Sequence, residues 1–347
     1  MSAVPETGGL PPERLAEVVR RGLGLGAATP VEIEEHDALS NINYVYRAQV
    51  PGQSLFLKVV PERPKRFPIQ MPRERVFSEA EGLRRCRVFA RGAIVIPQVL
   101  FVDEQEMTLG MSDVGQGRQV LYQRLHPLQP DGFALLSEQA EALGKALGAV
   151  HGDTRGGGRF RPPQEEAMVR RVIFDGLLAP GARLAFPDLW ESVRTEMESR
   201  TEALVHADLW SKNLLVRSGE PVAVVDFEGV HYGDPAFDLG TLFAVALVPA
   251  LAQPELVGEA LSFLSRLSDA WAMASGDSGW RREVEPRAFR ATAVFLAARG
   301  FGPFAYPLSA AAQGRIGELA RSLAASPPPH TEAFAERLAR LLEAPAA

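Results

Sequence analysis

Residues 206–216, HADLWSKNLLV, place a histidine, an aspartate two residues later and an asparagine five residues beyond that directly before an apolar run. Polar side chains seldom gather at the start of a buried strand for packing reasons alone, because a buried polar group must be hydrogen-bonded. Aspartate and asparagine also turn or cap loops, which is the structural alternative for both of them here. The stretch therefore predicts either a tight loop or a site of chemistry.

The residues that follow, NLLVRSGEPVAVVDFEG at 213–229, contain two short apolar runs around Ser-Gly-Glu-Pro and predict a β-hairpin. With a two-residue turn at Gly219 and Glu220, or with a four-residue loop, Asn213 lies directly opposite Asp226. An odd number of loop residues shifts this pairing by one. Facing residues have Cβ atoms about 4.5–5.5 Å apart, so an amide oxygen and a carboxylate could hold one small hard cation. Asp208 lies near the same end of the hairpin.

These residue types suit phosphoryl transfer, in which one carboxylate accepts the proton of a hydroxyl while oxygen ligands hold magnesium. The pattern His206-Ala-Asp208, four residues and Asn213, followed by Asp226, resembles the catalytic loop and metal aspartate of protein-kinase-like phosphotransferases. With GDPAFDLG at 233–240 it is most similar to their small-molecule branch, the aminoglycoside phosphotransferase family. The resemblance implies Asp208 as catalytic base, Asn213 and Asp226 as magnesium ligands, and His206 as a residue that braces the loop.

The N-terminal half contributes a lysine within an apolar strand, FLKV at 56–59. Burying Lys58 in that strand costs desolvation free energy unless a carboxylate or phosphate pairs with it. The structural alternative is a lysine on an edge strand that faces water. The family resemblance makes Lys58 the residue that contacts the phosphates of ATP, paired with a glutamate of the following helix. Glu79 in RVFSEAEGL fits that role best, and Glu81 is the alternative.

Two further segments are candidates for nucleotide binding by their position. SNINYVY at 40–46, with Ser40, Asn41 and Asn43, falls between the first two predicted strands, where a kinase folds a loop over the phosphates. A plain hairpin turn is the alternative, because asparagine tolerates left-handed turns. By its position, the segment Met111-Ser112-Asp113-Val114 would form the hinge whose backbone meets adenine.

The predicted elements divide the chain into two parts. Before residue 115 the pattern predicts a helix over 11–25, three strands within 32–60, a helix over 73–87 and strands over 98–102 and 107–111. After residue 116 it predicts, besides the hairpin, helices over 137–150, 186–202, 240–248, 254–274 and 287–299. We therefore expect an α+β protein with a protein-kinase-like bilobal fold. Residues 1–115 would form a small β-rich N-lobe with a nucleotide-binding antiparallel sheet, and 116–347 a larger helical C-lobe with the catalytic loop and the acceptor pocket.

Composition excludes several classes of function. A net charge of −6 without a basic segment argues against nucleic-acid binding. A single cysteine, Cys86, cannot form an internal disulfide, and MSAVPETGG at the start lacks the features of a signal peptide, so we expect a cytoplasmic protein. The longest apolar run, residues 239–252, contains a proline and is too short to span a membrane, which favours a buried helix.

The acceptor is less well defined by sequence. NINYVY, RVFSEAEGL and Asp226-Phe-Glu228 resemble methylthioribose kinase, and that resemblance implies Glu228 as a second metal carboxylate. Asn213 departs from that family, which tends to have another residue there. Asp-Phe-Glu together with Lys212-Asn213 also resembles choline and ethanolamine kinases. Segment 253–347 holds ten acidic and ten basic residues, a balance that does not suggest a pocket for polycationic aminoglycosides.

We expect an ATP- and Mg²⁺-dependent kinase that acts on the hydroxyl of a small metabolite, a sugar such as methylthioribose or an amino alcohol. The alternatives are a regulatory nucleotide-binding pseudokinase and an aminoglycoside-modifying kinase. A protein kinase is disfavoured because EGVHYGDPAFDLG leaves little room for a long activation loop. Arg287, Arg290 and Arg299 fall on one predicted helix and would be either solvated or available to an anionic acceptor. The sequence does not define an oligomeric state.

Overall fold

The computed structural model describes residues 9–36, 42–63, 65 and 71–343. The chain separates into two compact units, which are described one at a time. The first comprises Met1–Arg87 and Ile96–Gln116, and the second comprises Val88–Val95 and Gly117–Ala347. The candidate nucleotide-binding residues Ser40 and Asn41 lie outside the described residues. Among the described helices, none is both long and apolar enough to cross a membrane.

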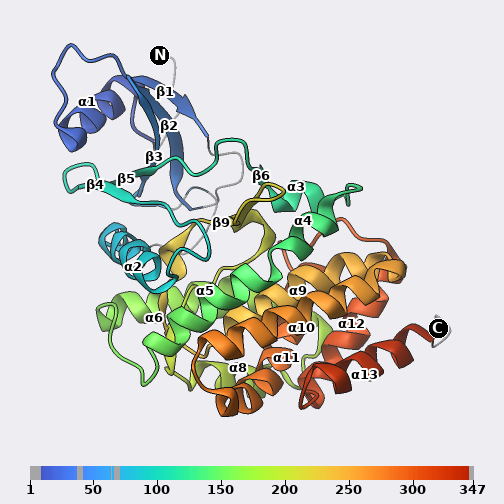
Figure 1. Cartoon of the computed structure of the whole chain (residues 1–347). Coiled ribbons are helices and arrows are strands. Elements are labelled where there is room, and N and C mark those ends of the chain that lie inside the picture. Colours follow the sequence, from blue (N-terminus) through green and yellow to red (C-terminus); the bar gives the residue numbers. More distant parts are fainter. Residues whose placement is uncertain (1–8, 37–41, 64, 66–70, 344–347) are drawn as a thin grey trace, which may run out of the picture. The chain divides into compact units, whose positions relative to one another are not determined.

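The first unit is built on a five-stranded antiparallel sheet in the order β1-β2-β3-β5-β4 (Figure 1). Its strands are β1 (Glu32–Glu35), β2 (Tyr44–Val50), β3 (Gln53–Val59), β4 (Val99–Asp103) and β5 (Thr108–Ser112), and its helices are α1 (Pro12–Leu23) and α2 (Arg75–Phe89), whose last residues belong to the second unit. The turn between β2 and β3 passes through Gly52 at φ 86°, a left-handed conformation that glycine adopts without strain. These strands and helices confirm the predictions for residues 11–111.

Helix α1 covers the sheet of the first unit through a compact apolar cluster. Leu15, Val18 and Val19 are fully buried with Leu55 and Leu57 of β3. The spacing of the three helix residues places them on one face, and the alternate residues of the strand point to the same side of the sheet. The packing is close because two glycines lie against the ring of Phe101, where an added Cβ at Gly22 or Gly110 would stand 2.4 Å from ring atoms.

The second unit is mainly helical and carries two small sheets. Its helices are α3 (Leu121–Leu125), α4 (Gly132–Glu138), α5 (Ala140–Asp153), α6 (Pro163–Arg171), a π-helix (Val172–Leu178), α7 (Ala179–Ala185), α8 (Trp190–Glu198), α9 (Ala236–Ala252), α10 (Val257–Ala274), α11 (Ser278–Phe301), α12 (Ala310–Ala325) and α13 (Thr331–Glu343). Strands β6 (Gln119–Val120), β8 (Leu214–Val216) and β9 (Ala223–Val224) form one sheet, and β7 (Ala203–Val205) pairs with β10 (His231–Gly233).

Helix α9 forms the centre of this unit. Every residue from 236 to 251 is buried, and α10, α11 and α12 all pack against it. Figure 1 shows α10 running beside α5, against which it packs. This is the apolar run that the sequence predicts as a buried helix, and it continues through Pro249 to Ala252. A helix that is apolar on all sides must be enclosed by other elements. α9 therefore forms part of the core of the second unit.

The hairpin pairing predicted from sequence is wrong by one residue. β8 and β9 pair Leu214 with Val224 and Leu215 with Ala223, so an odd number of residues separates the paired positions. The loop contains a turn in which Glu220 N donates to Arg217 O at 3.1 Å, followed by a proline that has no N–H for the ladder. Asn213 therefore lies opposite Val225, whose N–H donates to the Asn213 carbonyl at 3.0 Å.

Candidate active site

The loop after β7 is held in place by the carboxylate of Asp238 at the start of α9. Asp238 Oδ2 accepts a hydrogen bond from His206 N at 2.8 Å, and its Oδ1 accepts one from Ala207 N at 2.8 Å. Ala207 has φ 65°, a left-handed conformation that costs free energy for alanine and so needs such support. His206 Nδ1 accepts from Asp208 N at 3.2 Å. These contacts fix the backbone that carries Asp208.

Asp238 is in turn anchored by a buried histidine and tryptophan. His151 Nε2 lies 3.1 Å from Asp238 Oδ2, and Trp271 Nε1 donates to His151 Nδ1 at 2.9 Å. Because an indole nitrogen can only donate, the proton of the neutral ring is on Nε2 and is directed at the carboxylate. Burial alone would raise the pKa of Asp238, but its interactions with His151 and His206 outweigh burial and lower the pKa. Asp238 is therefore a charged residue inside the core.

The sequence reasoning assigned no role to these supporting residues. The only signal was a carboxylate within the apolar run AFDLGTLF at 236–243. A carboxylate at such a position needs several donors, and here the donors are backbone groups of the loop 206–207 and a histidine 87 residues away. The motif GDPAFDLG therefore contains the residue that shapes the loop around Asp208.

Asp208 and Asn213 are in direct contact. Asn213 lies in the short 3₁₀ helix Ser211–Asn213, just before β8, and its Nδ2 donates to Asp208 O at 2.9 Å and to Asp208 Oδ2 at 2.7 Å. These two bonds orient the amide, so that Asn213 Oδ1 is directed away from the carboxylate. No donor among the described residues reaches Asn213 Oδ1 or Asp208 Oδ1 in the hydrogen bonds of this loop. One carboxylate oxygen and one amide oxygen thus remain available as acceptors.

Asp226 and Glu228 add negative charge beside this pair. Asp226 has φ 67°, which aspartate tolerates better than most residues, and directly precedes the 3₁₀ helix Phe227–Gly229 that contains Glu228. Burial is the largest cause that raises the pKa of Asp208 to about 7, followed by the charge of Asp226. Glu228 adds to the rise, whereas Arg299 and the hydrogen bond from Asn213 oppose it. The structure therefore brings Asp208, Asn213, Asp226 and Glu228 together within the second unit.

The guanidinium of Arg161 holds the segment that carries Asp226 and Glu228 in place. This guanidinium is fully buried and donates to Val230 O at 2.7 Å and to Glu228 O at 2.5 Å. It also pairs with Glu165 on the adjoining helix. The buried ion pair compensates the charge of Arg161, while its remaining donors satisfy backbone carbonyls. The result is a rigid support for the two acidic side chains.

The donor set fits a magnesium ion. Among the described residues, no group of three or more His, Cys, Asp or Glu side chains is placed to hold a metal ion. Magnesium rarely uses an all-protein cage: it binds one or two carboxylates, and phosphates and water complete its shell. Asp226, Glu228 and Asn213 Oδ1 offer two carboxylates and one amide oxygen. A divalent cation there would also relieve the repulsion that these carboxylates exert on Asp208.

In the first unit, Lys58 and Glu79 form a buried ion pair. Lys58 Nζ lies 2.8 Å from Glu79 Oε1, and the two residues are 6% and 2% exposed. Lys58 is on β3, between β2 and β5, which excludes the alternative of a lysine on an edge strand. Glu81, the other candidate partner, instead accepts a hydrogen bond from Arg85 at 2.7 Å and is partly exposed.

The other candidate nucleotide-binding residues of the first unit have protein partners. Asn43 is buried, and its Oδ1 accepts from Arg75 Nη2 at 2.7 Å. Asp113 accepts from Arg47 Nε at 3.1 Å. Burial works to raise the pKa of Asp113, but the bond from Ser54 and the other donors outweigh it and lower the pKa. Met111 lies on β5 and pairs with Phe56 of β3.

Comparison with known proteins gives three kinds of similarity. Residues 37–282 match the model of a phosphotransferase enzyme family. Over 190 residues the chain is 26% identical to 4-hydroxytryptamine kinase from Psilocybe cyanescens. The aligned region covers 48% of this chain and 51% of that protein. Over 88 residues it is 33% identical to methylthioribose kinase from Geobacillus sp. (strain WCH70). This aligned region covers 25% of this chain and 22% of that protein. The chain thus spans about half or less of these curated relatives.

The fold has a counterpart among solved structures. The structure of a microcompartment-associated aminopropanol kinase superposes with a TM-score of 0.51 at 16% identity, over 94% of this chain and 98% of that chain. At this level of identity the likeness concerns the fold. It confirms the α+β, protein-kinase-like fold predicted from the sequence, with an antiparallel sheet in the smaller part and a helical majority.

Proposed function

Because the chain belongs to the phosphotransferase enzyme family, we propose that it transfers the γ-phosphate of ATP to a hydroxyl group of a small metabolite. The observation that carries this proposal is the pairing of Asp208 with Asn213 beside Asp226 and Glu228. Phosphoryl transfer requires little covalent chemistry from the protein, so a positioned carboxylate and a set of oxygen ligands are the parts it needs.

Asp208 is the proposed catalytic base. Asn213 Nδ2 holds Asp208 Oδ2, and Oδ1 is left to accept a hydrogen bond from the acceptor hydroxyl. As the oxygen of that hydroxyl bonds to the γ-phosphorus, the bond from the γ-phosphorus to the β–γ bridging oxygen breaks and ADP leaves, while the hydroxyl proton passes to Asp208 Oδ1. The backbone bonds from the loop to Asp238 keep the carboxylate in place, which lowers the entropic cost of alignment.

Asn213 Oδ1, Asp226 and Glu228 are the proposed magnesium ligands. A magnesium ion held there with ATP would supply positive charge that stabilises the negative charge developing on the phosphates during transfer. The residues of the chain contribute by placing their oxygens on a rigid segment, since Arg161 holds the backbone at Glu228 and Val230. A rigid set of ligands is what defines the geometry of a metal site.

Lys58 is the proposed contact to the phosphates of ATP. Glu79 Oε1 lies 2.8 Å from its ammonium group and helps to hold this group in one position. The backbone at Met111 and Asp113 is the proposed contact to adenine. The segment with Ser40, Asn41 and Asn43 is proposed to cover the phosphates, and the buried bond between Asn43 and Arg75 supports its C-terminal end.

The test is a screen for acceptor-dependent ADP formation with ATP and magnesium over methylthioribose, other sugars, choline, ethanolamine, homoserine and aminoglycosides. We expect turnover with at least one acceptor, and a decrease in kcat of about 10²- to 10⁴-fold in Asp208→Asn, the range that general-base catalysis supplies. The control is Asp188→Asn, because Asp188 is exposed and pairs with Arg321 at the surface. Undiminished turnover in Asp208→Asn would contradict the proposal. Stabilisation by ATP and magnesium without turnover across the panel would instead indicate a pseudokinase.

A further inference from the structure

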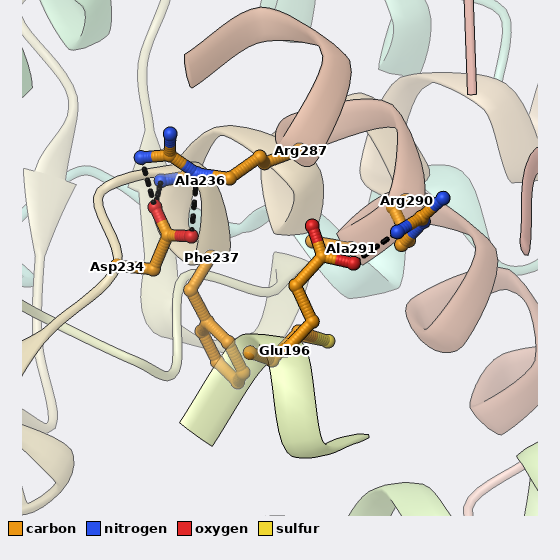
Figure 2. Close-up of a pocket in the computed structure, with 8 residues that line it drawn as sticks. Glu196, Asp234, Ala236, Phe237, Arg287, Arg290 and Ala291 are labelled. Atoms are coloured by element: carbon orange, nitrogen blue, oxygen red, sulfur yellow. Dashed lines mark hydrogen bonds and ion pairs between the residues drawn. The ribbon is translucent and has the colours of Figure 1, made fainter. Parts of the chain in front are cut away.

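Three arginines of α11 differ in how their charge is compensated. Arg287 Nε lies 2.8 Å from Asp234 Oδ2, and its Nη2 lies 2.8 Å from Glu202. Arg290 pairs with Glu196. Figure 2 shows the pairs with Asp234 and Glu196 on the wall of a small cavity that has room for about one water molecule. Both side chains therefore pair with carboxylates of the second unit, although a quarter of the Arg290 side chain remains exposed.

Arg299 follows Arg290 by nine residues on the same helix, and it is buried without an ion-pair partner among the described residues. It is 8% exposed. In the part of the chain that the structure describes, its guanidinium makes no ion pair or hydrogen bond, and its contacts are the ring of Trp210, 3.8 Å from its centroid, and that of Tyr306 at 5.9 Å. A stacked ring attracts the cation but accepts none of its five N–H groups in a hydrogen bond. Among the described residues, no carboxylate lies within ion-pair distance of this guanidinium, so a ligand carboxylate could take that place.

Apart from Asp208, the groups near Arg299 include aromatic rings and a second cation. His126 stacks on Tyr306 with ring centroids 3.8 Å apart, and Tyr122 lies 5.3 Å from His126. Lys212 Nζ lies 4.8 Å from the Trp210 ring centroid. Burial, helped by the charge of Arg299, lowers the pKa of His126 to about 3, so this histidine is neutral at pH 7. The rings that could receive a cationic head group already carry two cations of the protein, which disfavours a quaternary ammonium there.

The position of Arg299 relates it to Asp208. Asp208 is the carboxylate whose charge acts on Arg299, and Arg299 in turn lowers the pKa of Asp208. The geometry agrees with this, because Trp210, whose ring centroid lies 3.8 Å from the Arg299 guanidinium, follows Asp208 by two residues in the same loop. Arg299 therefore lies beside the loop that carries Asp208. A group bound by Arg299 would be part of the molecule whose hydroxyl meets Asp208.

We propose that the phosphate acceptor carries a carboxylate, and that Arg299, stacked on Trp210, binds this carboxylate while Asp208 engages the hydroxyl. The acceptor is then a small hydroxy acid. This inference rests on the proposed kinase activity and names its substrate class. The planar guanidinium suits a bidentate contact with a carboxylate, and its burial makes such a contact stronger than at the surface.

The test compares each acid with its neutral carboxamide as phosphate acceptor: 4-hydroxybutyrate, glycerate and homoserine against the three amides, with choline and methylthioribose alongside. We expect kcat/KM at least about 10-fold higher for one acid than for its amide. In Arg299→Met we expect about a 100-fold loss for that acid, mainly through KM, and in Arg299→Lys a partial recovery, because lysine keeps the charge without the fork. The matched control is Arg290→Met, on the same helix and paired with Glu196.

Binding is measured independently of turnover by the change in Tm that each acid produces in the presence of ADP and magnesium. An increase with wild type that is absent with Arg299→Met supports the inference, and equal shifts in both overturn it. Turnover of neutral or cationic acceptors as efficiently as acids overturns it as well, while the kinase proposal stands. A rise in the KM for ATP with an unchanged KM for the acid would place Arg299 on nucleotide phosphates and also overturn it. Failure of the kinase proposal itself would give a different result: with every acceptor, turnover would be the same in Asp208→Asn as in wild type.

Discussion

Lys58 and Glu79 form an ion pair in the first unit, in which both side chains are buried and lie 2.8 Å apart. Glu79→Gln removes the carboxylate of this buried pair, so we expect a Tm lower by several degrees and kcat/KM for ATP lower by about 10- to 100-fold. The control is Glu81→Gln, whose surface pair with Arg85 contributes less than about 1 kcal/mol. Measurements of Tm and of ATP kinetics on both variants check the assignment. Equal effects of the two substitutions would contradict it.

The candidate site shows which residues a sequence can indicate. Asp208, Asn213 and Asp226 are recognisable because their types and spacing suit one reaction. The bond from Asn213 to Asp208 was not predicted, since it depends on a 3₁₀ turn at 211–213 that no propensity indicates. Asp238 was missed for a related reason: its donors come from a loop and from His151, far away in the sequence. Local pattern identifies the reacting groups more readily than the groups that position them.

Helices α5 and α10 approach each other closely along a row of glycines, Gly144, Gly148 and Gly152. A Cβ at Gly148 would stand 2.3 Å from Trp271 O and 2.9 Å from Ala274 Cβ, both on the facing helix. This close packing also places His151 of α5 against Trp271 of α10, and so supports Asp238. The spacing of the three glycines is therefore a packing feature of the catalytic unit, although single glycines within a helix lower its intrinsic stability.

Gly148→Ala should separate these two helices. Because the contact is with backbone atoms, which cannot move aside, we expect a loss of about 1–3 kcal/mol in the free energy of unfolding and a lower Tm. Gly258→Ala, on α10, is the matched control: nothing lies within 4 Å of an added Cβ there. That substitution should stabilise the helix by about 0.5–1 kcal/mol. Thermal unfolding of both variants checks the prediction, and a Gly148→Ala protein as stable as wild type would refute the role of the glycine row.

Regular elements were predicted best where the apolar period is unbroken. The strands of the first unit and helices α5 and α10 lie close to their predicted ranges, whereas α9 and α11 extend beyond the predicted 240–248 and 287–299 at both ends. Residues 163–185 carried no prediction, yet they form α6, a π-helix and α7 in direct succession. Gly176, Pro180 and Gly181 interrupt the pattern there, and Gly181 is accommodated because it packs against the backbone of α11 at Ala297. Tertiary contacts, absent from a local reading, decide such segments.

The stability of the whole chain should depend on pH through His231 of β10. This side chain is 4% exposed, and burial lowers its pKa to about 4, with Arg170 and Arg161 adding to the decrease. The bond between Nδ1 and Gly229 O and the charge of Asp238 act in the opposite direction. An unfolded chain binds a proton at its histidines below about pH 6.5, whereas the folded protein keeps His231 neutral down to about pH 4. Acid therefore favours the unfolded state across this window.

His231→Asn tests this dependence, because asparagine keeps a donor near Gly229 O and does not titrate. Between pH 6.5 and pH 4 wild type should lose about 3 kcal/mol of stability through this histidine, and nothing through it above pH 6.5. The variant should be less stable than wild type at pH 7.5, where packing alone matters, and yet lose less as the pH falls. The measurement is the difference in Tm between pH 7.5 and pH 4.5 for the two proteins. Because His126, with a pKa of about 3, adds a dependence of the same sign in both, only the difference between their pH profiles reports on His231. Parallel profiles would show that its burial does not govern the response to acid.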